Sequence, residues 1–282
     1  MPPAADIIRR AAQLNRDDPR RQGSCIQLTG QCEVIVSGDI HGNRQNLAKI
    51  LAYANLPGKA DRFLVLQEII HGPADPASGQ DRSIELLLRA ARLKCAHEAQ
   101  VLFVLGNHDV AQITGSEITK NGQSFCKSFA EGVGYSFGQA DAAEILDAVA
   151  EFLLSLPLAV RCDNGVLIAH SLPSARQPSA AETLSRPFGK DDLSRRGGAY
   201  NWTWGRGHTP EQLESLAGEL GVEFFILGHR HAAGGLEVLS RRAVVLASDH
   251  PHGQIIHFST DSPLSAESAQ AKARPIVALG AD

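Results

Sequence analysis

Four short apolar runs, each ending in polar residues that can bind metals, constrain the fold of this chain more than any other feature. The runs are "VIVSGDIHGN", "VLFVLGNHDV", "VLIAHS" and "FFILGHRH". Such runs, rich in Val and Ile, are typical of strands buried on both faces. The ends of strands in an open α/β sheet converge on one crevice. We therefore expect the polar residues after these runs to meet, although they lie far apart in the sequence.

Helical patterns separate the early strand patterns. The expected helices cover residues 44–54, 82–97 and 210–220. Strand–helix–strand repetition favours parallel strands with right-handed crossovers, whereas closely spaced later strands favour a second sheet or an antiparallel edge. The sequence therefore predicts an α/β fold. The expected strands are 33–37, 63–66, 101–105, 158–161, 166–169, 224–227, 243–247 and 254–258.

Two stretches interrupt this rhythm and suggest how the chain is organised. Residues 110–155 lack a strand pattern but carry helix patterns near 122–131 and 141–155, which predicts a helical cap inserted over the C-terminal ends of the strands. Residues 171–208 are too long for a passive connection and predict a substrate loop. Residues 1–24 are expected to form a helical extension and 261–282 a partly ordered tail, which leaves 25–260 as the main domain.

Composition excludes several classes of protein. The formal charge of −4 lacks the basic excess of a nucleic-acid binder. The five cysteines form no CxxC pair, which argues against a disulfide framework and against a thiolate zinc site. No run of about 18 apolar residues and no signal-peptide pattern is present. We expect a cytoplasmic protein with neither a membrane nor a nucleic-acid partner.

The residue types at the strand ends favour a metal site. A single His after a strand is usually structural or exposed. Four strand patterns that all end in Asp, Asn or His are harder to attribute to chance, and mixed imidazole and carboxylate ligands suit zinc, manganese or iron rather than calcium.

The motifs "GDIHG", "GNHD", "VLIAHS" and "LGHRH" resemble, in the same order, the metal-binding motifs of the calcineurin-like metallophosphoesterases. The resemblance covers about residues 33–258. "GDIHGN" and "YNWTWGRG" are more similar to the serine/threonine protein phosphatase branch than to other branches. The resemblance implies two mixed β-sheets packed as a sandwich and flanked by helices, with two metal ions (Mn, Fe or Zn) bound at one edge.

The resemblance also implies the ligands. Its "GDxxDRG" motif, which supplies a carboxylate shared by both ions, is absent, and "LQEIIHGP" stands in its place. Glu68 then occupies the position of the bridging Asp and is one methylene longer. The implied first-ion ligands are Asp39, His41 and His231, and the implied second-ion ligands are Asn107, His170 and His229.

A mechanism follows from the resemblance. A hydroxide bridging the two ions would attack phosphorus, His108 would protonate the leaving oxygen, and Asp109 would orient His108. Arg206 is the first choice for a phosphate-binding residue, with Asn107 and Arg44 as further candidates.

His71 follows Glu68 by three residues, where the family's Arg is missing. It is interpreted as a substitute phosphate donor, as a partner of another site residue, or as an ordinary loop residue.

The expected function is hydrolysis of phosphomonoesters, as in serine/threonine protein phosphatases, on a phosphoprotein or a small phosphoester. One alternative is hydrolysis of small nucleotides such as dinucleoside polyphosphates. A second is a metal-binding scaffold without catalysis, which the loss of the "GDxxDRG" Asp favours and the retention of His108 and Asp109 opposes. The sequence leaves the oligomeric state open.

Overall fold

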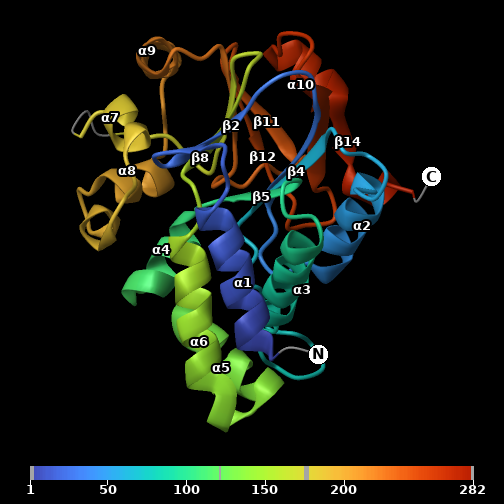
Figure 1. Ribbon diagram of the computed structural model, residues 1–282, viewed down its shortest axis with the longest axis vertical. Helices are drawn as coiled ribbons and strands as arrows, with labels where there is room; N and C mark the ends of the chain where they lie inside the picture. Colours follow the sequence, from blue (N-terminus) through green and yellow to red (C-terminus); the bar gives the residue numbers. More distant parts are fainter. Residues whose placement is uncertain (1–2, 121, 175–177, 281–282) are drawn as a thin grey trace.

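The computed structural model describes residues 3–120, 122–174 and 178–280 and contains two large mixed sheets (Figure 1). One sheet has the strand order β1-β2-β8-β9-β10-β12-β11 and the other β14-β13-β3-β4-β5. The first comprises β1 (Arg21–Gln22), β2 (Cys25–Leu28), β8 (Ala159–Cys162), β9 (Val166–Ala169), β10 (Phe224–Leu227), β12 (Ala243–Leu246) and β11 (Leu236–Ser240). The second comprises β14 (Ala273–Pro275), β13 (Gln254–Ser259), β3 (Glu33–Asp39), β4 (Arg62–Gln67) and β5 (Val101–Val104).

Strand direction explains why both sheets are mixed. Strands β3, β4 and β5 run parallel, as do β9, β10 and β12. Strand β13 is antiparallel to β3, and β8 is antiparallel to β9. The predicted α/β fold of two mixed sheets flanked by helices is confirmed.

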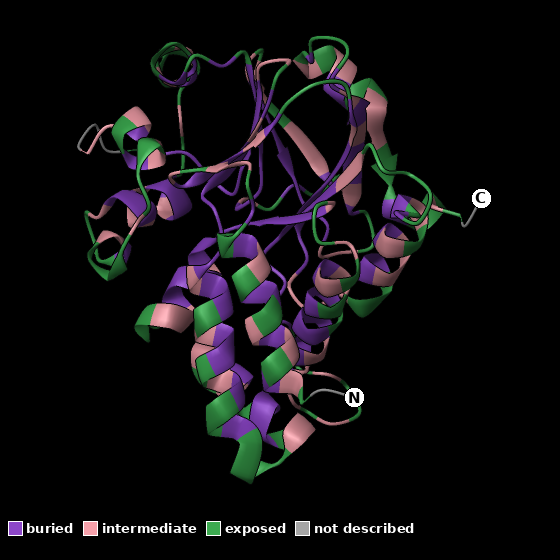
Figure 2. Ribbon diagram, viewed as in Figure 1, coloured by how far each residue is buried: buried purple, intermediate pink, exposed green. Residues whose placement is uncertain are grey.

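Alternate residues of the strands face different parts of the core, as the pleat of a strand requires. Val34 and Val36 of β3 pack with Ile168 of β9 and Ile226 of β10 between the sheets. Ile35, between the two valines, belongs to the cluster that the outer helices cover. Buried residues therefore run through both sheets (Figure 2).

Helices cover the outer faces of the sheets. Helix α1 packs against α6 and α3, and α5 packs against the same two helices, so these four form one layer (Figure 1). The helices are α1 (Ala4–Arg16), α2 (Arg44–Ala54), α3 (Ser83–Ala96), α4 (Asn107–Thr114), α5 (Phe125–Phe137), α6 (Gln139–Leu154), α7 (Ala180–Ser185), α8 (Gly198–Trp204), α9 (Pro210–Leu220) and α10 (Ala266–Lys272), with short 3-10 turns η1 (Lys190–Leu193) and η2 (Ile276–Ala278).

Both ends of the described chain pack against the main domain. The helix within the expected extension 1–24 is α1, which buries Ile8 completely among the other helices. Within the expected tail 261–282, β14 pairs with β13, and α10 also packs against β13. The Ala- and Ser-rich composition of this segment concealed one capped helix and a short edge strand.

The expected insert and loop both contain structure. Residues 110–155 contain most of α4, a hairpin of β6 (Thr119–Lys120) and β7 (Gln123–Ser124), and helices α5 and α6. Residues 171–208 contain α7, η1 and α8, with 175–177 outside the described residues. None of the described helices is long and apolar enough to cross a membrane.

Replacement of Ile8 by Ala tests whether α1 is part of the core. Because Ile8 is fully buried, Ile8→Ala should lower the free energy of unfolding by about 2–4 kcal/mol. Val277→Ala is the control, since Val277 is 57% exposed and its loss should change stability by less than about 0.5 kcal/mol. Urea denaturation followed by circular dichroism measures both, and equal stabilities would show that α1 contributes little.

Candidate metal centre

Strand ends from both sheets meet at one edge of the molecule. Asp39 is the last residue of β3, and a parallel bridge joins it to Ala247, just beyond β12. This bridge brings the C-terminal ends of the parallel strands of the two sheets together. The predicted convergence of polar strand ends is therefore present.

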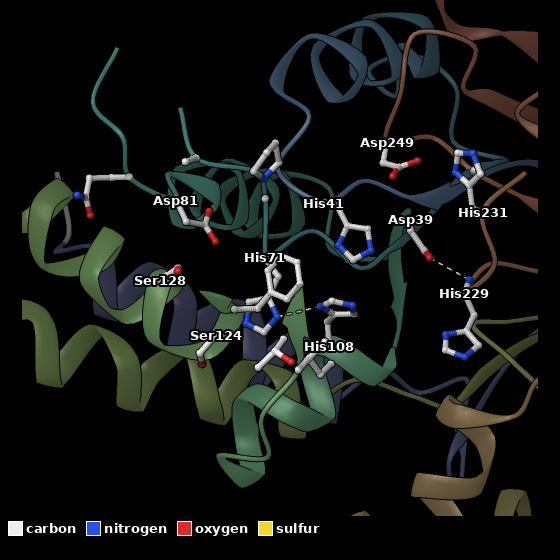
Figure 3. A pocket seen from close by; sticks show the side chains of 18 of the residues that line it. Asp39, His41, His71, Asp81, His108, Ser124, Ser128, His229, His231 and Asp249 are labelled. Atoms are coloured by element: carbon white, nitrogen blue, oxygen red, sulfur yellow. Dashed lines mark hydrogen bonds between the residues drawn. The ribbon is translucent and has the colours of Figure 1, made fainter. Parts of the chain in front are cut away.

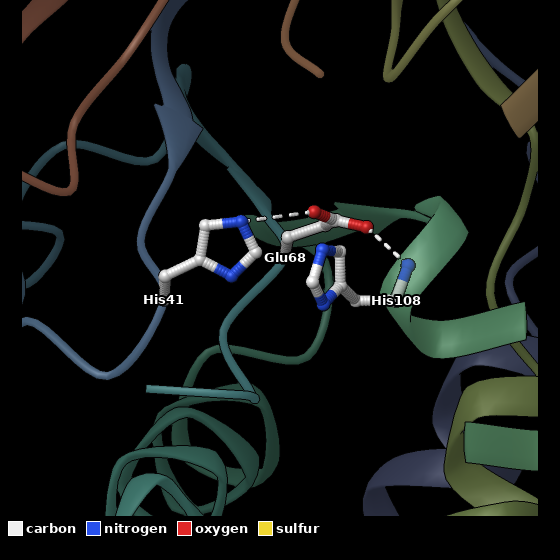
Figure 4. A group of neighbouring side chains, drawn as sticks. All are labelled: His41, Glu68 and His108. Carbon is white, nitrogen blue, oxygen red and sulfur yellow. Dashed lines mark hydrogen bonds and ion pairs between the residues drawn. The ribbon is translucent and has the colours of Figure 1, made fainter. Parts of the chain in front are cut away.

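Glu68 lies at the centre of this edge. It follows β4 and is only 2% exposed. Its Oε2 lies 3.3 Å from His41 Nε2, and its Oε1 accepts a hydrogen bond of 2.7 Å from the backbone N–H of His108. Figure 4 shows the carboxylate between His41 and His108. The same Oε1 lies 3.6 Å from His170 Nε2. Glu68 therefore faces ligand candidates on both sides.

Two groups of side chains could each hold a metal ion, and both contain Glu68. One consists of His41, Glu68 and His108, and the other of Asp39, Glu68 and His170. Within each group, the potential ligand atoms lie within 4.8 Å of one another. A carboxylate common to two groups is what a bridging ligand requires.

Two further predicted ligands lie beside His170. Its Nε2 lies 2.9 Å from Asn107 Oδ1 and 3.0 Å from His229 Nδ1. These three atoms and Glu68 Oε1 come from four separate strand ends. They supply the amide, imidazole and carboxylate donors expected around the second ion.

Unpaired polar atoms and crowded charges indicate that the centre suits cations. Asp39 Oδ1 and His170 Nδ1 are buried, lie 3.3 Å apart and make no hydrogen bond to the described residues. Burial, together with the charges of Asp39 and Asp109, raises the pKa of Glu68 well above its usual value. Burial also opposes ionisation of Asp39, but its imidazole neighbours, His170 first, lower its pKa to about 2. Bound cations would relieve this repulsion.

The backbone is strained where the ligands are. Glu68, His41 and His229 have φ values of 31°, 41° and 68°, in a region that residues other than glycine rarely adopt. The backbone oxygen of Glu68 accepts hydrogen bonds from Ile40 N and His41 N, at 3.0 and 2.8 Å. The loops after β3 and β4 thus hold each other in place.

Two glycines give the carboxylates room. A Cβ on Gly106 would lie 2.2 Å from Glu68 Oε1, and one on Gly228 would lie 2.4 Å from Asp39 Oδ1. The glycines of "GNHD" and "LGHRH" are therefore needed for the close approach of backbone to ligand.

The hydrogen bond described for the Asp109 side chain is with the start of its own helix, and its role in orienting His108 stays a prediction. Its Oδ2 accepts a hydrogen bond of 2.9 Å from Gly106 N and caps helix α4, and burial raises its pKa to about 7. Consecutive helical residues point in different directions, which explains why the two side chains separate. The hydrogen bond described for the His108 ring is with His71, at 3.0 Å between their Nδ1 atoms, and the ring also meets those of His41 and Phe125.

His71 is the residue whose role the sequence could not identify. It is 2% exposed, and burial lowers its pKa to about 4. His71 is therefore a buried residue of the loop after β4. Only its place three residues after Glu68 hinted at a site role.

The two predicted arginines occupy different surroundings. Arg206 lines the cavity beside the centre, and its Nε donates a hydrogen bond of 2.7 Å to His229 Nε2. Arg44 instead forms an ion pair of 2.5 Å with Glu85 of α3 and does not line this cavity.

His231 also lines the cavity but is exposed and belongs to neither ligand group. Its ring lies 5.2 Å from that of His250. Its role as a ligand of the first ion stays a prediction.

The cavity has a volume of about 860 Å³ and extends from the centre to the helical insert. Figure 3 shows Ser124 and Ser128 of the insert on one side and His229 and His231 on the other. The insert therefore forms a wall of the cavity, and a substrate of moderate size fits beside the candidate ligands.

The comparisons with known proteins agree with this fold and site. A family model described as calcineurin-like phosphoesterase matches residues 33–233. The protein is thus a metal-dependent phosphoesterase. The chain belongs to the calcineurin-like phosphoesterase family. No curated protein matches the chain at a significant level.

Solved structures share the fold at low sequence identity. A protein serine/threonine phosphatase from Saccharomyces cerevisiae, with similarity to human phosphatase PP5, is 18% identical over 90% of this chain and 81% of its own, with a TM-score of 0.67. A cold-active protein-tyrosine phosphatase of a psychrophilic Shewanella is 14% identical over 87% and 78%, with a TM-score of 0.55.

Replacement of Glu68 by Gln tests whether its carboxylate is shared by two ions. The neutral amide has the same size, so Glu68→Gln should retain the fold but bind fewer metal ions and lose activity by at least about a hundredfold. Elemental analysis and turnover of a phosphate ester measure this. Glu85→Gln, at a partly buried carboxylate of α3 that does not line the cavity, is the matched control. Normal metal content and turnover in the Glu68 variant would contradict the bridging role.

Proposed function

We propose that the chain hydrolyses phosphomonoesters with two metal ions that share Glu68, in the manner of a serine/threonine protein phosphatase. The observation that carries the proposal is the presence of Glu68 in both candidate ligand groups. A pair of divalent ions bound there would lower the pKa of a water molecule and neutralise charge on the phosphate.

The ligand assignment divides the centre in two. Asp39, His41 and His231 would hold the first ion, and Asn107, His170 and His229 would hold the second. The short distances from His170 Nε2 to Asn107 and His229 support the second set.

The remaining polar residues act on the substrate. Arg206 is exposed at the cavity and holds a phosphate oxygen, while its hydrogen bond orients the guanidinium against His229.

His108 lines the same cavity and gives a proton to the leaving oxygen. Burial lowers the pKa of His108 to about 2, and the negative charge of a bound phosphate acts in the opposite direction. Arg44 is held by Glu85 and takes no part.

A phosphorylated serine or threonine side chain is the proposed substrate. This proposal is supported by the fold that 90% of this chain shares with the Saccharomyces cerevisiae serine/threonine phosphatase. Residues of the insert line a cavity of about 860 Å³, a size typical of small-molecule sites. This feature favours the second candidate, a small nucleotide such as a dinucleoside polyphosphate.

One assay panel decides between these substrates. The protein, loaded separately with Mn, Fe and Zn, is offered a phosphoserine peptide, p-nitrophenyl phosphate and a dinucleoside polyphosphate. We expect turnover of the first two. Turnover of the dinucleoside polyphosphate alone would replace the proposal with the nucleotide function, and no turnover with any metal would leave a binding scaffold.

Replacement of His108 by Asn separates a proton donor from a metal ligand. His108→Asn should retain both ions but lower kcat by about 10²–10⁴-fold, the usual contribution of general acid–base catalysis. Elemental analysis beside steady-state kinetics measures the two effects. Loss of an ion would instead make His108 a ligand in the group that it forms with His41 and Glu68.

Replacement of the two arginines tests which one holds phosphate. A hydrogen bond to a charged group contributes about 1.5–3 kcal/mol, so Arg206→Ala should raise KM by about 10-fold to 100-fold. Arg44→Ala is the matched control and should leave KM unchanged within about twofold, since its partner is Glu85. Inhibition by inorganic phosphate should weaken in the first variant alone. Equal effects of the two would contradict the assignment.

A further inference from the structure

His71 is held at both ends of its ring. Its Nδ1 lies 3.0 Å from His108 Nδ1, and its Nε2 lies 2.9 Å from Gln112 Oε1. His108 and Gln112 are one turn apart on α4 and therefore lie on the same face of the helix. The ring of His71 thus spans successive turns of the helix that carries the proposed proton donor.

The donor and acceptor atoms fix the direction of the two hydrogen bonds that join Gln112, His71 and His108. An amide oxygen only accepts, so His71 Nε2 donates to Gln112 Oε1. No described hydrogen bond or ion pair joins His71 to a carboxylate, and an unpaired charge would be costly at 2% exposure. His71 is therefore neutral, and its Nδ1 accepts a hydrogen bond from the Nδ1–H of His108. This leaves His108 Nε2 for the cavity, and Figure 3 shows it on the side away from His71.

The helical insert closes on the pair. The ring of Phe125, the first residue of α5, lies parallel to that of His71 at 5.8 Å and edge-on to that of His108 at 5.3 Å. Phe129 meets His71 edge-on at 5.7 Å. These contacts fix the plane of His71, which its two hydrogen bonds alone would leave free to tilt.

We propose that His71 is a positioning residue, which holds the ring of His108 so that Nε2 faces the leaving group, and that Gln112 and Phe125 anchor it from the insert side. The inference rests on the proposed function. In the reaction, phosphorus gains a bond to a water oxygen and loses its bond to the leaving oxygen, which keeps the electron pair. His108 gives a proton to that oxygen and is protonated again by solvent, which also takes up the proton that the attacking water loses.

The leaving group provides the test, because a proton donor matters only where the leaving oxygen is strongly basic. In His71→Leu, kcat on phenyl phosphate and on a phosphoserine peptide should fall by about 10-fold to 100-fold, whereas kcat on p-nitrophenyl phosphate should fall by less than about threefold. KM and metal content should stay unchanged. An equal fall on all substrates would indicate a merely structural role and would overturn the proposal.

Two further variants keep the test independent of folding. His71→Asn places an amide oxygen near the position of Nδ1 and should restore much of the activity on phenyl phosphate. Gln112→Leu removes the other anchor and should shift the substrate ratio in the same direction as His71→Leu.

His257→Leu is the matched control, since it removes a partly buried His bonded to Tyr53 outside the cavity and should leave the ratio unchanged. A shifted substrate ratio in the control, or an unshifted ratio in both His71→Leu and Gln112→Leu, counts against the proposal.

A double variant tests whether His71 acts through His108. His71→Leu combined with His108→Asn should be no slower on phenyl phosphate than His108→Asn alone. Multiplied losses would mean that His71 acts independently and would overturn the proposal. Failure of the proposed function is distinguishable, because the wild-type protein would then hydrolyse none of the phosphomonoesters.

Discussion

The structure depends on the burial of three neighbouring carboxyl groups at the edge where the two sheets meet. Asp39, Glu68 and Asp109 are each at most 7% exposed, and the charges of the other two contribute to the raised pKa of Glu68. Asp109 accepts a hydrogen bond from Gly106 N as it caps α4, and this bond partly offsets the cost of its burial. For Asp39, the neighbouring imidazoles offset that cost. The Glu68 carboxylate accepts one hydrogen bond from a backbone N–H, and two histidines lie 3.3 and 3.6 Å from it. Among the three carboxyl groups, Glu68 is therefore the one whose charge a bound cation would stabilise most.

This arrangement explains why the surrounding backbone is so constrained. Four of the six described non-glycine residues with positive φ belong to the centre, namely His41, Glu68, His71 and His229. A strained residue persists only where its surroundings over-determine it. Here two sheets, a helix start and two glycines without room for a Cβ provide that support. The strain is therefore a consequence of bringing ligands from separate strands to one point.

The sequence predicted the parts of the fold that depend on local patterns. The apolar runs give β9 and β10 at the expected bounds, and helix α2 begins where Asn43 caps it. Strand β11 was missed because it lies at the sheet edge and has no buried face to produce alternation. The types of polar side chain that meet at this edge could be predicted from the strand ends. The partner of His108 could not, because it depends on the rotation of α4 and on how α5 packs against the loop after β4.

Glu68 and His71 belong to the same loop after β4, and both contact helix α4. Because Glu68 reaches one methylene further than an Asp, its carboxylate extends over Gly106 to the backbone N–H of His108. The start of α4 is thereby fixed by a carboxylate from the loop after β4. His71, on the same loop, fixes the side chain of His108 and the next turn of the helix. One loop thus controls both the backbone and the ring of the proposed proton donor, and the insert that closes over it shapes the substrate cavity.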